Sequence, residues 1–156
     1  MSDSRKQLSA AELDVGVRAC VAGGADLVYL FGSQASGKRW AESDIDFAVL
    51  LGPGVPRERY GKVQLELIGK LMSALGADAV DVVILNTASP VLAYEGVVRG
   101  GKVLFAKDSL ARIRFEVAVF QRYADTAHLR DVQNQYLYRA IQARAAQVVG
   151  EGGHSW

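Results

Sequence analysis

Short apolar runs alternate along the chain with stretches of polar and turn-forming residues. Four such runs have the length of a strand and are bounded by turn-forming or polar residues, at residues 27–31, 45–51, 80–85 and 102–105. The turn-rich segment 52–56 and the pair Gly100-Gly101 are among these boundaries. Apolar runs of this length between turn signals are typical of buried strands, so the pattern predicts a small sheet of four strands.

Other segments repeat apolar residues every three or four positions, which is the spacing of helices. Ser9 and Glu12 form a capping box that predicts a first helix over about 10–22. A second apolar stripe predicts a helix over 60–75, which Gly76 can terminate. A short helix is expected at 90–98, and the pattern is helical again from 108 or 109 onward, with a break near 123–128.

The order of these segments predicts one domain. No internal repeat, low-complexity tract or linker marks a second one. We expect a flexible N-terminus at residues 1–8 and a single domain over 9–149, with a core at about 9–106 and C-terminal helices at about 109–149. The Gly-rich segment 150–156 is expected to be a flexible tail.

Composition narrows the class of function. Half of the 156 residues are hydrophobic, which is ample for one core, and the formal net charge is only +1. No general field for binding polyanions is therefore expected, and direct nucleic-acid binding is not expected either. No apolar run approaches the ~20 residues that a membrane span requires, and no apolar h-region follows the polar first six residues, so we expect a cytoplasmic protein.

The cysteine and histidine residues of the sequence do not indicate a disulfide or a zinc site. The single cysteine, Cys20, lies at helical spacing with apolar neighbours, so a buried core thiol is expected. His128 and His154 lack ligand spacing to each other and to Cys20, which argues against a zinc site.

The segment 31–49 contains two candidate phosphate sites. The first is Gly32-x4-Gly37-Lys38, which follows a predicted strand as a P-loop does. A P-loop requires Ser or Thr after the lysine to hold magnesium, whereas Arg39 stands there. The next strand begins at about residue 45, which leaves no room for the helix that a P-loop opens. We therefore reject the P-loop interpretation.

The second candidate joins Gly32 and Ser33, across ten residues, to Asp44-x-Asp46. Side chains alternate along a strand, so Asp44 and Asp46 are expected on one face, where they can share one or two divalent cations. Magnesium there would remove the repulsion between the carboxylates and bridge the phosphates of a nucleoside triphosphate. Gly32 lets the backbone approach those phosphates closely, and Ser33 offers a hydroxyl and an amide.

A third carboxylate is expected near the attacking oxygen in two-metal nucleotidyl transfer. Asp81 is the favoured candidate because it opens an otherwise apolar strand, where a buried carboxylate is costly without a metal or a donor. Asp78 is the alternative, but it follows the Gly76-Ala77 turn, where a solvated Asp is ordinary. Lys38 and Arg39 are candidates for further phosphate contacts.

A structural interpretation of the Asp pair competes with the metal site, namely that Asp44 caps the strand and Asp46 pairs with a base on a solvated face. With ten Asp in the chain, an Asp-x-Asp pair is expected about once by chance, so the pair alone carries little weight. The Gly-Ser pair at a fixed distance before it, between two predicted strands, makes the metal site the better interpretation.

These residues resemble a known family. Gly32-Ser33, ten residues and then Asp44-x-Asp46, with Asp81 opening the later DVVIL strand, are similar to the minimal nucleotidyltransferase (MNT) group of the DNA polymerase beta-like superfamily. Within that group the chain most resembles the MntA-like antitoxins that accompany HEPN-domain toxins. One departure is Gln34, where a basic residue often follows the Gly-Ser pair.

The resemblance implies a fold and a function. The fold is α/β (α+β), with a polymerase beta-like core of a small mixed sheet flanked by helices and a helical C-terminal segment. The implied activity is magnesium-dependent transfer of AMP from ATP to a tyrosine of a cognate HEPN ribonuclease toxin, in a hetero-oligomer. Asp44, Asp46 and Asp81 would hold the metals, and Asp81 would assist loss of the tyrosine proton. The alternatives are transfer to a small hydroxylated compound such as an aminoglycoside, and an antitoxin that acts by binding alone.

Overall fold

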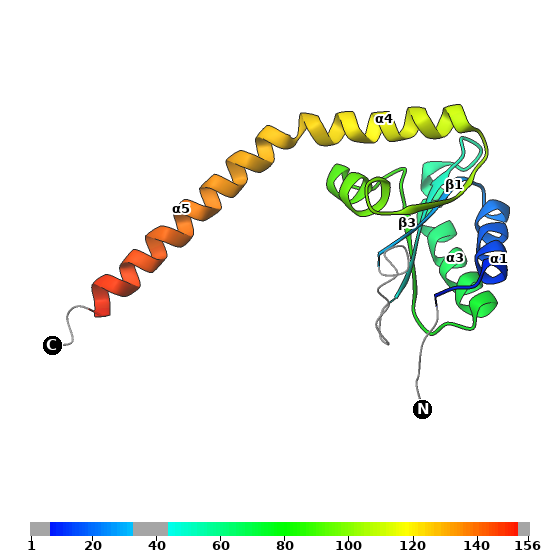
Figure 1. The fold of residues 1–156 in the computed structure, drawn as a ribbon, viewed down its shortest axis with the longest axis horizontal. Helices are drawn as coiled ribbons and strands as arrows, with labels where there is room; N and C mark the ends of the chain where they lie inside the picture. Colours follow the sequence, from blue (N-terminus) through cyan, green and yellow to red (C-terminus); the bar gives the residue numbers. More distant parts are fainter. Residues whose placement is uncertain (1–6, 33–43, 153–156) are drawn as a thin grey trace. The chain divides into compact units, whose positions relative to one another are not determined.

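The computed structural model describes residues 7–32 and 44–152 and contains a four-stranded mixed sheet (Figure 1). The strands lie in the order β3-β2-β1-β4. Their bounds are Ala25–Phe31 (β1), Ile45–Leu51 (β2), Val80–Ile84 (β3) and Lys102–Ala106 (β4). All four predicted strands are therefore present, with ends that differ from the predicted ones by two residues at most.

The pairing directions decide which strand ends meet. β1 runs antiparallel to both β2 and β4, while β2 and β3 are parallel. The carboxyl end of β1 therefore lies beside the amino ends of β2 and β3. Residues that follow β1 or begin β2 and β3 are thus brought to one end of the sheet, although up to about fifty positions separate them in sequence.

Two helices cover one face of the sheet, α1 (Ala10–Ala22) and α3 (Tyr60–Leu75), which follows the short turn η1 (Arg57–Arg59) (Figure 1). Both predicted capping signals are confirmed. Ser9 and Glu12 form the reciprocal capping box, and Gly76 ends α3 in the left-handed conformation, with φ of 59°. Phe47 and Leu71 belong to the core between these helices and the sheet. Cys20 is also fully buried there, and burial raises the pKa of its thiol to about 12.

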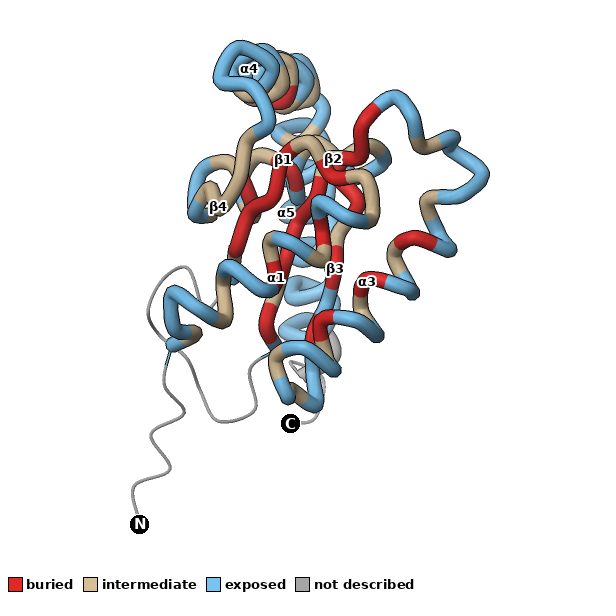
Figure 2. Tube along the Cα trace, turned by 90° about the vertical axis from the view of Figure 1, so that its right-hand side faces the viewer, coloured by how far each residue is buried: buried red, intermediate tan, exposed pale blue. Residues whose placement is uncertain are grey.

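The opposite face is covered by η2 (Leu92–Val98) and the first part of α4 (Ser109–Asp125). η2 was expected as an ordinary helix over 90–98, but residues 92–98 form a π-helix. Val97 and Val119 bring η2 and α4 into a second core with Tyr29 and Ala48 of the sheet. The buried positions of the chain accordingly follow the strands, with exposed residues on the outer sides of the helices (Figure 2).

The chain divides into two compact units, one ending at Phe120 and one beginning at Gln121. The second contains the end of α4 and the helix α5 (Ala127–Gly152), so the break predicted near 123–128 falls at Thr126. There the Arg130 guanidinium lies 3.9 Å from the centre of the Tyr123 ring and donates hydrogen bonds to the Tyr123 carbonyl and the Thr126 hydroxyl. α5 extends to Gly152, into the segment predicted as a tail. Within the described ranges, no helix has the length and apolar character needed to cross a bilayer.

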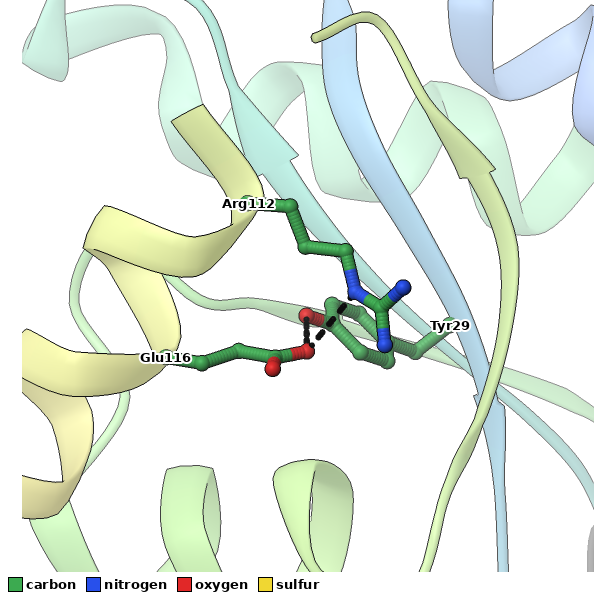
Figure 3. A network of polar contacts seen from close by, with 3 residues as sticks. All are labelled: Tyr29, Arg112 and Glu116. Carbon is green, nitrogen blue, oxygen red and sulfur yellow. Dashed lines mark hydrogen bonds and ion pairs between the residues drawn. The ribbon is translucent and has the colours of Figure 1, made fainter. Parts of the chain in front are cut away.

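A partly buried polar contact ties α4 to the middle of the sheet (Figure 3). Tyr29 of β1 is 1% exposed, and its hydroxyl donates a hydrogen bond of 2.8 Å to Oε1 of Glu116. Nε of Arg112 donates to the same oxygen at 3.0 Å. Burial, and then the hydrogen bond to the Glu116 carboxylate, raise the pKa of Tyr29. The phenol therefore stays protonated and keeps its role as a donor.

Removing either partner of this contact is expected to destabilise the protein. Tyr29→Phe removes the donor and should cost about 1–2 kcal/mol of unfolding free energy, while Glu116→Ala leaves the buried hydroxyl without its acceptor and should cost about 2–3 kcal/mol. Urea unfolding measures both values. Glu66→Ala is the control, since Glu66 and Lys62 form an exposed pair at 4.0 Å and its loss should cost under about 0.5 kcal/mol. A Glu116→Ala cost no larger than that of the control would contradict the role of this contact.

Candidate functional site

The three predicted carboxylates lie at one end of the sheet. Asp44 immediately precedes β2, and Asp46 is the second residue of that strand. Asp46 and Asp81 are direct partners in the parallel register of β2 and β3. Ile45 and Val82 belong to the core beneath α1 and α3, so the alternation of side chains directs Asp46 and Asp81 to the opposite face. Neighbouring strands are about 4.8 Å apart, which makes these two carboxylates immediate neighbours.

Gly32 follows β1 and lies against Asp46. Phe31, the last residue of β1, is paired with Asp46, so the next residue turns over that side chain. Gly32 has φ of +70°, a conformation that side chains rarely adopt. A Cβ at this position would also collide with Oδ2 of Asp46. Glycine is therefore required here on two grounds. The approach to phosphates that the sequence predicts for Gly32 stays a prediction.

Asp46 carries an unfavourable charge in this arrangement. Burial first, and then the charges of Asp81 and Asp44, raise the pKa of its carboxyl from 3.8 to about 6. No hydrogen bond or ion pair from another described residue offsets that cost. Among the described residues, this half-buried carboxylate has two acidic neighbours and no basic partner, which differs from the solvated ion pair of the structural interpretation. A bound cation would relieve the repulsion that raises this pKa.

Asp81 is exposed to solvent, whereas the sequence predicted a buried carboxylate. The side chain is exposed because β3 is the edge strand of the sheet. Oδ1 of Asp81 accepts a hydrogen bond of 2.9 Å from the backbone N–H of Val82. The alternative, Asp78, lies in the turn before β3 and is exposed. The register thus favours Asp81 over Asp78 as the neighbour of Asp46.

The carboxylates share a face but do not form a closed set of ligands. Across residues 7–32 and 44–152, no three His, Cys, Asp or Glu side chains are arranged to hold a metal ion. The donor chemistry nevertheless fits magnesium, which takes carboxylate oxygens and keeps part of its water shell, and Asp46 already bears the repulsion that a cation would remove. Ser33, Lys38 and Arg39, the remaining predicted site residues, lie outside the described residues.

Sequence reasoning missed Gln64, which supports the strand that carries Asp81. Gln64 projects from α3, and its Nε2 donates a hydrogen bond of 2.6 Å to the Val82 carbonyl. The signal was present in the helix pattern, because position 64 lies four residues from both Tyr60 and Ile68 on the apolar stripe. A polar residue in such a stripe indicates a specific buried partner.

The chain matches the model of a known protein family. The family model described as "Polymerase beta, Nucleotidyltransferase" matches residues 24–110, which include all four strands and the three carboxylates. The match covers more than half of the chain, which therefore belongs to the polymerase beta nucleotidyltransferase family.

Individual relatives place the chain more narrowly within that family. Protein adenylyltransferase MntA of Shewanella oneidensis is 43% identical over 74 residues, which are 47% of this chain. The match spans only 50% of the length of that protein.

Solved structures match a larger share of the chain. A toxin–antitoxin crystal structure with AMP-PNP matches with a TM-score of 0.68 and 30% identity, over 80% of this chain and 98% of the other. A complex of a tri-AMPylated Shewanella oneidensis HEPN toxin with an MNT antitoxin matches with a TM-score of 0.62 and 28% identity, over 81% and 97% of the two chains. The resemblance to the minimal nucleotidyltransferases is confirmed by these matches.

The raised pKa of Asp46 gives a testable pH dependence. The folded protein binds this proton more tightly than the unfolded chain does, so the metal-free protein should lose stability as the pH rises from about 4 to 6. Asp46→Asn removes that loss. With solvent screening, the variant should be about 1 kcal/mol more stable than the wild type at pH 7.5, or about 2–4 °C in Tm, with little difference near pH 4.

Thermal unfolding in EDTA at both pH values measures this difference. Asp78→Asn, at an exposed turn position, is the control and should change Tm little at either pH. A destabilised Asp46→Asn variant at pH 7.5 would show that the carboxylate has a stabilising partner. Added magnesium should raise the Tm of the wild type and not that of Asp46→Asn, since binding to the folded state stabilises it.

Proposed function

We propose that this protein is a magnesium-dependent protein adenylyltransferase that transfers AMP from ATP to a hydroxyl of a cognate HEPN toxin, and so acts as an antitoxin. The observation that carries the proposal is the register of Asp46 opposite Asp81 with Gly32 against the Asp46 carboxylate. Among similar chains, one is named as a protein adenylyltransferase and another was solved in complex with an AMPylated toxin. The resemblance further suggests that the acceptor is a tyrosine.

The proposed roles of the residues follow from their positions. Asp44 and Asp46 are the candidates to hold magnesium, with Asp81 completing the set on the side of β3. Bound magnesium would neutralise phosphate charge and polarise the reacting phosphorus. Gly32 provides the close backbone approach beside the polyphosphate, and Ser33, Lys38 and Arg39 are proposed to contact its oxygens. A related toxin–antitoxin structure carries two Asp-to-Glu exchanges two positions apart, the spacing of Asp44 and Asp46.

The proposed reaction is an in-line displacement at the α-phosphorus of ATP. The acceptor oxygen forms a bond to this phosphorus while the bond to the oxygen bridging to the β-phosphate breaks. Pyrophosphate leaves with that electron pair, and the hydroxyl proton is lost with the assistance of the Asp81 carboxylate. AMP remains on the acceptor, and no further co-reactant is required.

The order of the strands suggests the direction of this displacement. Gly32 follows β1, Asp46 belongs to β2 and Asp81 to β3, in that sequence across the sheet. With the leaving pyrophosphate beside Gly32 and the phosphorus above Asp46, an in-line attack brings the acceptor over Asp81. The acceptor is thus expected from the β3 edge. We propose that the reaction takes place in the cytoplasm, within a hetero-oligomer of this protein and the toxin.

Asp44→Asn combined with Asp46→Asn tests the function directly. Labelled ATP, magnesium and the cognate HEPN toxin are incubated with each variant, and transfer to the toxin is counted. The double variant should lose more than about 100-fold in rate, since about 2.7 kcal/mol of transition-state stabilisation is a modest share of what metal ions supply. Asp78→Asn should label at the wild-type rate. Absence of labelling by the wild type, or equal labelling by the double variant, would refute the proposal.

A further inference from the structure

A groove of about 410 Å³ lies along the free edge of β3. The first turn of α3, the end of β3 and the segment leading to η2 form its walls. We call it the edge groove, and its lining residues are Tyr60, Gly61, Gln64, Val83, Ile84, Thr87, Ala88 and Leu92. None of these described lining residues is charged, and Val83, Ile84, Ala88 and Leu92 present apolar surface. Such a lining is unsuited to a polyphosphate and suits an apolar or aromatic side chain.

The backbone of β3 at this edge is already hydrogen-bonded. The Val82 N–H is bonded to the Asp81 side chain and the Val82 carbonyl to the Gln64 side chain. An added strand would need free backbone N–H and C=O groups on β3 to pair with. At Val82 both groups are already occupied by side chains of this chain. The edge groove offers a side chain of the partner a place to bind beside this blocked position.

The edge groove and the candidate site share strand β3. Val83, which lines it, follows Asp81 by two residues, so the two side chains lie on the same face about 7 Å apart along the strand. The acceptor is expected to cross this same edge, since an in-line attack places it over β3. A protein acceptor that presents its hydroxyl to Asp81 thus has neighbouring side chains within reach of the groove.

We propose that the edge groove is a docking subsite for the protein acceptor, which takes an apolar or aromatic side chain flanking the modified residue. This inference rests on the proposed function. It adds a second recognition point beyond the reacting hydroxyl, so that the position of the groove selects which hydroxyl of the partner is modified. Binding energy gained there orients the acceptor for attack rather than contributing to ATP binding.

The two exposed glycines of α3 provide a matched test. A Cβ at Gly61 or at Gly69 would meet no atom within 4 Å, so each accepts a side chain without disturbing the core. Gly61 lines the edge groove, whereas Gly69, eight residues further along the same helix, does not. Gly61→Arg fills the groove, and Gly69→Arg makes the same change in charge and helix propensity away from it. Thr87→Arg, at an exposed lining position, blocks the groove from the opposite wall.

The readout is the steady-state rate of AMP transfer, with toxin and ATP each varied in turn. Gly61→Arg and Thr87→Arg should each raise the KM for the toxin by about tenfold or more, with the KM for ATP unchanged. The Tm of Gly61→Arg should shift no differently from that of Gly69→Arg, since both exchanges raise helix propensity. Gly69→Arg should match the wild type. Unchanged toxin KM in both groove variants, or an effect shared equally by Gly69→Arg, would overturn the inference. A rise in the KM for ATP instead would assign the groove to the nucleotide and overturn it as well.

Direct binding separates this inference from the proposed function. Calorimetric titration of the unmodified toxin into each variant, without ATP, should show about tenfold weaker binding for Gly61→Arg than for Gly69→Arg. If the wild type fails to label the toxin, the proposed function is wrong, while this titration still decides whether the groove docks the partner. If labelling proceeds but the two variants bind alike, the groove inference fails alone.

Discussion

The parallel pairing of β2 with β3 is the constraint on which the rest of the site depends. It sets Asp46 directly opposite Asp81, and the strand alternation turns both away from the core under α1 and α3. No described basic side chain relieves the repulsion between the Asp46 and Asp81 carboxylates. This repulsion therefore destabilises the folded protein when both groups are ionised. The hydrophobic burial of Ile45, Phe47 and Val82 on the opposite face holds the strands in register despite that repulsion. Burial of the core thus offsets the repulsion between the two carboxylates.

The helices and strands around Asp46 and Asp81 each contribute a contact that shapes this end of the sheet or its supporting core. β1 delivers Gly32 to the Asp46 carboxylate, where both the backbone angle and the lack of space exclude a larger residue. α3 carries Gln64 to the Val82 carbonyl and so fixes the edge strand from the outside. On the face that bears the carboxylates, η2 and α4 close the core further along the strands, and Tyr29 anchors α4 through Glu116. In the proposed function, the substrates bind at the end of the sheet that bears the carboxylates.

The strands, the two covering helices and their caps could be predicted from the sequence because each rests on local signals. The apolar run at 45–51, the capping box at Ser9 and the terminating Gly76 are readable without knowledge of the tertiary structure. The spacing from Gly32 singled out the Asp pair in the sequence, and in the fold Asp81 is the register partner of Asp46. The roles assigned to these residues stay predictions. The exposure of Asp81 and the contact of Gln64 with Val82 were not predictable, since both follow from β3 lying at the sheet edge, and strand order is a property of the whole fold. The π-helical form of η2 was also missed, because no local pattern distinguishes it from an ordinary helix.

Asp81 accepts a hydrogen bond from the Val82 N–H, and this contact gives the residue a second role, in solubility rather than in chemistry. A side chain that covers the edge of a sheet keeps that edge from pairing with a strand of another molecule. A chain with alanine at position 81 would expose an unpaired N–H on its outermost strand, and self-association would accompany any loss of activity. Asparagine retains an acceptor oxygen for that N–H. The two exchanges therefore separate the role of the charge from the protection of the sheet edge.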